Sequence, residues 1–138
     1  MTAFVLDASI ALSWCFLDEA TTATWALLDR LETEAATVPA LWPLELGNIL
    51  ATAERRGRLT SARGAEFLGL LDGLDIEVDH ETAPRALRET LAIAKAQGIT
   101  TYDACYLELA MRLGVPLATK DARLAQAAGR LGVVVLGG

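Results

Sequence analysis

Residues 114–136, GVPLATKDARLAQAAGRLGVVVL, contain the pattern of a strand, a helix and a second strand. Val115–Thr119 is a short apolar run with its proline near the start, where a strand tolerates proline. Asp121–Leu131 has apolar residues at helical spacing, and Val133–Leu136 is a second continuous apolar run. Two neighbouring strands joined by a helix run parallel to each other. This unit therefore predicts an α/β protein with a parallel sheet.

The same alternation of short strands and longer helices extends back to the N-terminus. The other predicted strands are Phe4–Leu6, Thr37–Val38 and Ile76–Val78. The other predicted helices are Ile10–Phe16, Glu19–Ala35, Pro43–Arg56, Thr60–Leu74, Thr82–Gln97 and Tyr102–Leu113. Strands this short and this apolar are typical of a parallel sheet that is covered on both faces. We therefore predict a single domain over residues 1–138, a three-layer α/β/α sandwich with a central, mostly parallel sheet of about five short strands.

The composition fits one compact domain with apolar surface to spare. Of the 138 residues, 53% are hydrophobic, compared with roughly 45–50% in an average soluble domain. The excess indicates a well-filled core and an apolar patch for a partner. No apolar run reaches the length of about 18 residues that predicts a transmembrane helix. The apolar segment 3–17 contains Asp7 and has no basic residues before it, so we do not expect a signal peptide.

The cysteines and the net charge restrict the function classes. Cys15 and Cys105 lie in apolar helical patterns and form no CxxC pair, so we expect reduced core thiols in a cytoplasmic protein. The net charge of −6 by itself argues against nucleic-acid binding, because phosphate attracts basic surfaces. A nuclease is still compatible with this charge if bound cations screen a group of acids and act on the scissile phosphate.

Three aspartates lie where the predicted fold would bind a ligand. In an open parallel sheet, that place is at the carboxyl ends of the strands, near the point where the strand order reverses. Asp7 directly follows the first strand, Asp121 follows Thr119 by two residues, and Asp103 begins a helix. Asp7 or Asp121 could instead cap the following helix, since Asp is a favoured N-cap residue, and Asp103 could complete a capping arrangement with Thr100.

Glu45 stands between Leu44 and Leu46 in a largely apolar helix, without a Lys or Arg within one helical turn. A carboxylate near a buried surface is costly unless it is paired or binds a cation. The alternative is a partly solvated helix start, where Glu interacts favourably with the helix dipole. Four converging carboxylates would repel each other without cations, and oxygen ligands suit Mg²⁺ or Mn²⁺. The only histidine, His80, is expected on the surface, which disfavours zinc and His-dependent catalysis.

Four blocks of the sequence resemble the PIN-domain family, in particular the VapC-type toxin ribonucleases of toxin–antitoxin pairs. The blocks are Val5–Ser9 (VLDAS), Pro43–Asn48 (PLELGN), Thr101–Ala110 (TYDACYLELA) and Pro116–Asp121 (PLATKD). They follow the family's order and spacing, and the resemblance covers the whole chain. A single block would carry no weight, but the four together are specific.

The resemblance implies both an activity and a set of site residues. The family's catalytic and metal-binding acids correspond to Asp7, Glu45, Asp103 and Asp121. Ser9, Asn48 and Thr119 fall at positions that often support these acids by hydrogen bonds, although each could equally be a cap or turn residue. The implied activity is Mg²⁺- or Mn²⁺-dependent endonucleolytic hydrolysis of RNA. The implied partners are a second copy in a homodimer and a cognate VapB-like antitoxin that occludes the site.

RNA binding also requires positive charge. The densest basic group surrounds the turn at Gly57 and consists of Arg55, Arg56, Arg58 and Arg63. These residues either contact RNA or the antitoxin, or they form a solvated helix end favoured by the dipole. Lys120 and Arg123, beside Asp121, are further candidates.

The sequence leaves other functions open. A signalling domain that accepts a phosphoryl group on Asp usually needs an acidic pair at the end of the first strand, whereas Asp7 is flanked by Leu6 and Ala8. A non-catalytic PIN-fold interaction module would not need the four acids that are retained here. A housekeeping RNA-processing nuclease is the third alternative, and a neighbouring antitoxin gene would separate it from a toxin.

Overall fold

One five-stranded sheet forms the centre of the computed structural model, which describes all of residues 1–138. The strands are β1 (Thr2–Leu6), β2 (Ala35–Val38), β3 (Ile76–Val78), β4 (Leu117–Ala118) and β5 (Val135–Leu136). Their order in the sheet is β3-β2-β1-β4-β5, and every neighbouring pair is parallel. The predicted sheet is therefore confirmed, and it is parallel throughout.

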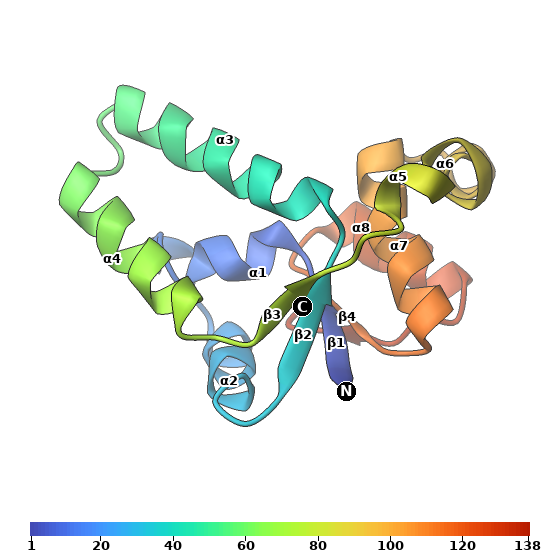
Figure 1. Ribbon diagram of the computed structural model, residues 1–138, viewed down its shortest axis with the longest axis horizontal. Helices are drawn as coiled ribbons and strands as arrows, with labels where there is room; N and C mark the ends of the chain where they lie inside the picture. The colour runs from blue at the N-terminus through green and yellow to red at the C-terminus, as the bar shows by residue number, and fades with distance from the viewer.

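Helices cover both faces of this sheet, with α1–α4 on one side and α5–α8 on the other (Figure 1). The first group consists of α1 (Ala8–Ser13), α2 (Thr22–Arg30), α3 (Leu41–Arg55) and α4 (Ser61–Asp72). The second group consists of α5 (Thr82–Arg85), α6 (Leu91–Gln97), α7 (Thr101–Leu113) and α8 (Ala122–Arg130). A 3₁₀ turn, η1 (Leu17–Glu19), precedes α2, and a π-helical turn, η2 (Ala86–Thr90), joins α5 to α6. The prediction of a three-layer α/β/α sandwich is confirmed.

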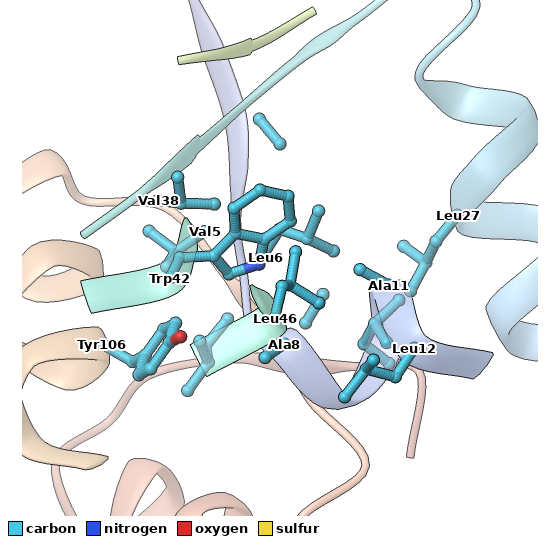
Figure 2. Close-up of a cluster of buried hydrophobic side chains, with 14 of the residues drawn as sticks. Val5, Leu6, Ala8, Ala11, Leu12, Leu27, Val38, Trp42, Leu46 and Tyr106 are labelled. Carbon is cyan, nitrogen blue, oxygen red and sulfur yellow. The ribbon is translucent and has the colours of Figure 1, made fainter. Parts of the chain in front are cut away.

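The hydrophobic core is centred on β1. Phe4, Val5 and Leu6 are fully buried, as expected for a strand covered on both faces. Figure 2 shows part of the same core, in which Trp42 and Leu46 of α3 lie close to Leu6. Burial of each large apolar side chain stabilises the fold by about 1.5–3 kcal/mol. This packing fixes the ends of β1, α3 and α7 relative to one another, and those ends carry the candidate site.

Several smaller expectations are also settled. Cys15 and Cys105 are buried and free, and His80 is exposed, as predicted. The helices α6 and α7 end at Gly98 and Gly114, whose positive φ angles of 65° and 67° provide left-handed C-caps. None of the helices combines the length and the hydropathy that a membrane-spanning segment requires.

The predicted helix Glu19–Ala35 is wrong at both ends, because α2 covers only Thr22–Arg30 and Ala35 already belongs to β2. The start is set by a reciprocal cap. The backbone N of Thr24 donates to Thr21 Oγ1 over 3.1 Å, and the backbone N of Thr21 donates to Thr24 Oγ1 over 2.9 Å. This cap uses a threonine where the recognisable sequence signature has Glu or Gln, so the pattern did not reveal it.

The predicted helix Thr82–Gln97 is interrupted. Its middle is the π-helical turn η2, in which Arg88 has non-helical backbone angles of φ −119° and ψ −106°. Kinks of this kind are typical of π-bulges. The residue pattern stays helical through the segment, so periodicity alone does not predict the break.

Candidate active site

The strand order reverses between β1 and β4. The chain adds β2 and β3 on one side of β1 and then returns to add β4 and β5 on the other. Ligand sites of open parallel sheets lie at the carboxyl ends of the strands at such a reversal. Asp7 directly follows β1, and Asp121 lies shortly after β4. The backbone N of Asp7 donates to the carbonyl of Ala118 over 3.0 Å, which holds the two strand ends in register.

Two hydroxyl groups hold the buried carboxylate of Asp7. Ser9 Oγ and Thr119 Oγ1 each donate to Asp7 Oδ2 over 2.7 Å, so Oδ1 accepts from neither hydroxyl. Burial raises the pKa of Asp7, the two hydroxyl bonds lower it, and the neighbouring Asp121 raises it again. The net effect is a pKa above the ordinary value for Asp. A negative charge at this position is therefore destabilised in the absence of a cation.

The same two hydroxyls also fix the loop that carries Asp121. The backbone N of Lys120 donates to Ser9 Oγ over 2.9 Å, and the backbone N of Asp121 donates to Thr119 Oγ1 over 3.0 Å. Asp121 in turn caps α8, because its Oδ1 accepts from the amides of Arg123 and Leu124 over 2.9 and 3.0 Å. The capping role of Asp121 is therefore real, and it leaves Oδ2 without a hydrogen bond.

Glu45 lies in the first turns of α3 and is held from the opposite layer. Tyr106 of α7 donates its hydroxyl to Glu45 Oε1 over 2.5 Å, and Tyr106 is almost completely buried. Burial raises the pKa of Glu45, the bond from Tyr106 lowers it, and the charges of Asp7 and Asp103 raise it. Sequence reasoning did not identify Tyr106 as a site residue. The available signal was its position three residues after Asp103, which places both on one helix face.

Asp103 lies in the first turn of α7, where its backbone N donates to Thr100 Oγ1 over 3.0 Å. Burial raises the pKa of Asp103, and the charges of Asp121 and Asp7 raise it further, while Arg123 lowers it. The charges of the acids thus act on one another across four separate elements. The structure therefore places the four predicted acids near enough to the carboxyl end of β1 for their charges to act on one another, without bringing their carboxylates into one coordination group.

None of these four acids has a basic partner. The ion pairs of the protein join other carboxylates to arginines, and none includes Asp7, Glu45, Asp103 or Asp121. Glu108 on α7 shows the contrast, because this acid is as buried as Asp7 and pairs with Arg112 over 2.9 Å, whereas Glu45 and Asp103 are half-buried and Asp121 is exposed. An acid cluster without basic partners is costly to ionise.

The donor set fits a hard divalent cation in its chemistry. All four candidate ligands are carboxylates, and Glu45 Oε2 and Asp121 Oδ2 accept no hydrogen bond from the protein. Oxygen donors of this kind are the preferred ligands of Mg²⁺ and Mn²⁺. As the side chains stand, however, no three His, Cys, Asp or Glu residues form a group that could already hold an ion. Binding would therefore require the carboxylates to move closer together.

The remaining predicted site residues have different surroundings. Asn48 is exposed on α3, one turn after Glu45, and its side chain makes no hydrogen bond to the acids. Lys120 donates through Nζ to the backbone carbonyl of Glu19. Arg123 lies close enough to lower the pKa of Asp103. The structure therefore places Ser9 and Thr119 against the acids and leaves Asn48 free.

The basic group around Gly57 divides into engaged and free side chains. Arg58 pairs with Glu19 over 2.6 Å, and its guanidinium lies 4.1 Å from the ring centroid of Phe16. Arg63 donates to the backbone carbonyl of Trp14 over 2.8 Å. The side chain of Arg55 reaches only the hydroxyl of Thr52, over 3.3 Å, and the side chain of Arg56 makes no hydrogen bond or ion pair.

Comparison with known proteins finds relatives of this chain in sequence and in fold. Residues 4–130 match the family model described as the PIN domain. Ribonuclease VapC1 of Mycobacterium tuberculosis is 32% identical over 99 residues, which cover 72% of this chain and 72% of the relative. The crystal structure of PAE2754 from Pyrobaculum aerophilum has a TM-score of 0.70 at 24% identity, covering 97% of this chain and 83% of that one. VapBC2 from Rickettsia felis, bound to a DNA fragment from its promoter, has a TM-score of 0.67 at 11% identity, covering 97% of both chains. At these identities, the two structural likenesses show a shared fold.

Proposed function

The chain belongs to the PIN-domain family, in its VapC-like branch, and on that premise we propose that it is a Mg²⁺- or Mn²⁺-dependent endoribonuclease. At the coarser level, it is a PIN nuclease of the toxin–antitoxin type. The finer proposal assigns metal binding and catalysis to Asp7, Glu45, Asp103 and Asp121. The observation that carries it is the convergence of these acids at the strand reversal without a basic partner.

A bound divalent cation would supply positive charge at the scissile phosphate and lower the pKa of water near it. Asp7, Asp103 and Asp121 are the residues that would hold it, with Glu45 as a further ligand or as the group that orients the attacking water. Ser9 and Thr119 keep the carboxylate of Asp7 in one orientation through their bonds to Oδ2. Hydrolysis then leaves a 5′-phosphate and a 3′-hydroxyl.

Tyr106 and Glu45 form the second part of the mechanism. The hydroxyl of Tyr106 fixes Glu45 through Oε1 and leaves Oε2 for the water. Burial and the neighbouring acids raise the pKa of Glu45, and a carboxylate with a raised pKa accepts a proton from water more readily. Glu45 can thus orient the nucleophile and take up its proton.

The test is RNA cleavage by the purified protein with Mg²⁺. We expect Asp103→Asn to lose more than about 100-fold in rate, because removal of an outer-shell partner alone costs about 10- to 100-fold. Asp29→Asn is the matched control, since Asp29 is exposed on α2 and the charge change is the same. Full activity of Asp103→Asn would refute the assignment.

We also propose that a VapB-like antitoxin docks in an apolar groove between α3 and α4, which lie next to each other in Figure 1. The groove has a volume of about 670 Å³, and Trp42, Leu46 and Leu68 are among its lining residues. Most of the lining side chains are hydrophobic, so an amphipathic segment of an incoming chain would bury its apolar face there. The name of the Rickettsia structure, VapBC2, supports an assembly of this kind.

The antitoxin proposal is tested with the protein encoded next to this gene. We expect Leu68→Glu to weaken its binding and to leave RNA cleavage intact, because Leu68 is half exposed in the groove and is not among the proposed site residues. Unchanged antitoxin binding by the Leu68→Glu variant would exclude the groove between α3 and α4 as the docking site. Absence of any antitoxin-like neighbour would instead favour a housekeeping nuclease. The homodimer stays a prediction, and light scattering of the purified protein tests it.

A further inference from the structure

Polar side chains follow one face of α3 from the acid site to the turn at Gly57. Glu45, Asn48, Thr52 and Arg56 succeed one another at intervals of three or four residues, which places them along a single helix face. Asn48 and Arg56 are exposed, and Thr52 is half-buried. With a rise of 1.5 Å per residue, Arg56 lies about 17 Å from Glu45 along the helix axis. The face thus leads directly away from the candidate active site.

A pocket of about 300 Å³ lies along this face, from Asn48 to the turn at Gly57. Its lining residues are Asn48, Ile49, Thr52, Ala53, Arg56 and Arg58. An amide, a hydroxyl and guanidinium groups are the side chains that proteins use to bind phosphate oxygens of nucleic acids. No carboxylate is among the lining residues. The pocket therefore has the chemistry of a phosphate subsite.

The available charge within this pocket is concentrated on Arg56. Arg58 is largely neutralised, because it pairs with Glu19 over 2.6 Å and lies 3.5 Å from Asp18. The side chain of Arg56 makes no hydrogen bond or ion pair, and Arg56 is exposed to solvent. In a chain with a net charge of −6, a free arginine beside neutral polar groups still gives a polyanion a local positive charge to bind.

The pocket and the acid site share one surface. Glu19 connects them, because its carboxylate pairs with Arg58 and its backbone carbonyl accepts from Nζ of Lys120. Lys120 directly precedes Asp121 in the loop after β4. In Figure 1, α3 passes over α1, the helix that begins immediately after Asp7. A strand that enters the acid site can therefore continue along α3 without crossing the core.

We propose that the α3 face from Asn48 to Arg56 binds the phosphate backbone of a single-stranded RNA substrate, with Arg56 contacting a phosphate several nucleotides from the scissile bond. This inference rests on the proposed function and adds the path of its substrate. The hydrogen-bond donors of Asn48, Thr52 and Arg56 form a single row along α3. Such a row matches the one phosphate backbone of single-stranded RNA, whereas an RNA duplex presents two backbones. Contacts to phosphate position the strand without reading its sequence, so Arg56 contributes affinity and not sequence preference.

Salt dependence of RNA binding tests this path without requiring cleavage. A fluorescent single-stranded oligonucleotide is titrated with the Asp103→Asn protein in Mg²⁺ at several salt concentrations, and fluorescence anisotropy gives the affinity. We expect the additional change Arg56→Ala to weaken binding several-fold and to reduce the log–log salt slope by about 0.7, the value for one lost phosphate contact on a single strand.

Arg30→Ala is the matched control. Arg30 ends α2 just before β2 begins, so it lies at the amino edge of the sheet, opposite the acids, and its loss changes the net charge equally. We expect Arg30→Ala to leave the salt slope unchanged. An unchanged slope in Arg56→Ala would overturn the proposal, and so would a slope that falls equally in both variants. Weakened antitoxin binding with unchanged RNA binding would assign the pocket to the protein partner and would also overturn it. If RNA binding depends on Arg56 but the protein with all four acids intact does not cleave RNA, the proposed nuclease function is refuted. The proposed RNA path along α3 is then still supported.

Discussion

Replacing Thr119 by valine removes one hydroxyl group from the interior of the site and leaves the shape of the side chain nearly unchanged. Thr119 is fully buried. Its hydroxyl donates to Asp7 Oδ2 over 2.7 Å and accepts from the backbone N of Asp121 over 3.0 Å. The substitution therefore breaks one hydrogen bond to a carboxylate and one bond that holds the loop after β4.

The magnitude follows from these two bonds. A hydrogen bond to a charged group contributes about 1.5–3 kcal/mol to stability, and a bond between neutral groups about 0.5–1.5 kcal/mol. We expect Thr119→Val to lower the free energy of unfolding by about 2–4 kcal/mol. For a domain of this size, each kcal/mol corresponds to a fall in Tm of about 4 °C.

Urea denaturation followed by circular dichroism, in EDTA at neutral pH, measures this loss. Thr37→Val is the control, because Thr37 is buried in β2 and its hydroxyl bonds only to the neutral hydroxyl of Thr2. We expect the control to lose no more than about 1.5 kcal/mol. An equal loss in the two variants, or none in Thr119→Val, would show that the hydroxyl of Thr119 does not hold Asp7 and Asp121 together.

Three further predictions concern the charges of the site and their supports. Burial raises the pKa values of Asp7, Glu45 and Asp103. At pH values between the ordinary and the raised pKa, the folded state therefore binds more protons than the unfolded state. In EDTA, we expect the free energy of unfolding to fall as pH rises through that window. Melting curves from pH 4 to pH 7 measure this, and a Tm that rises over the same range would contradict it. Asp7→Asn removes a buried charge but keeps an acceptor for the hydroxyls of Ser9 and Thr119. We expect a higher Tm than that of the unsubstituted protein in EDTA, and a smaller increase in Tm on addition of Mg²⁺. Differential scanning calorimetry measures both, and an undiminished increase with Mg²⁺ would count against Asp7 as a ligand. Tyr106→Phe frees Glu45 Oε1, and we expect a loss of about tenfold or more in kcat with a smaller change in KM. Steady-state cleavage kinetics test this, and a kcat equal to that of the parent would remove Tyr106 from the mechanism.

The positions of Asp7 and Asp121 could be predicted because each follows a short apolar run. In a parallel sheet, residues after such runs gather at one edge, so the sequence order alone suggested their proximity. Glu45 was recognisable as an acid in an otherwise apolar helix. Its partner Tyr106 shares a helix face with Asp103, three residues earlier, but that spacing does not indicate a contact with Glu45, 61 positions away in the chain.

The basic residues show a different limit of sequence reasoning. The density of arginines around Gly57 was evident, but the sequence does not tell which of them are free. Arg58 and Arg63 are engaged by Glu19 and by the carbonyl of Trp14, which lie about 40 to 50 residues earlier in the chain. Only the tertiary structure shows that Arg56 is left without a partner.

The central claim is that Asp7, Glu45, Asp103 and Asp121 together bind a divalent cation, and the position of Mn²⁺ tests it most directly. Crystals grown or soaked with Mn²⁺ give an anomalous signal that locates the ion without reference to activity. We expect a peak at the carboxyl end of the sheet, with carboxylate oxygens of at least two of the four acids at about 2.0–2.2 Å, the usual distance for a small divalent cation. A protein that cleaves RNA with Mn²⁺ but shows no peak among these acids would contradict the account.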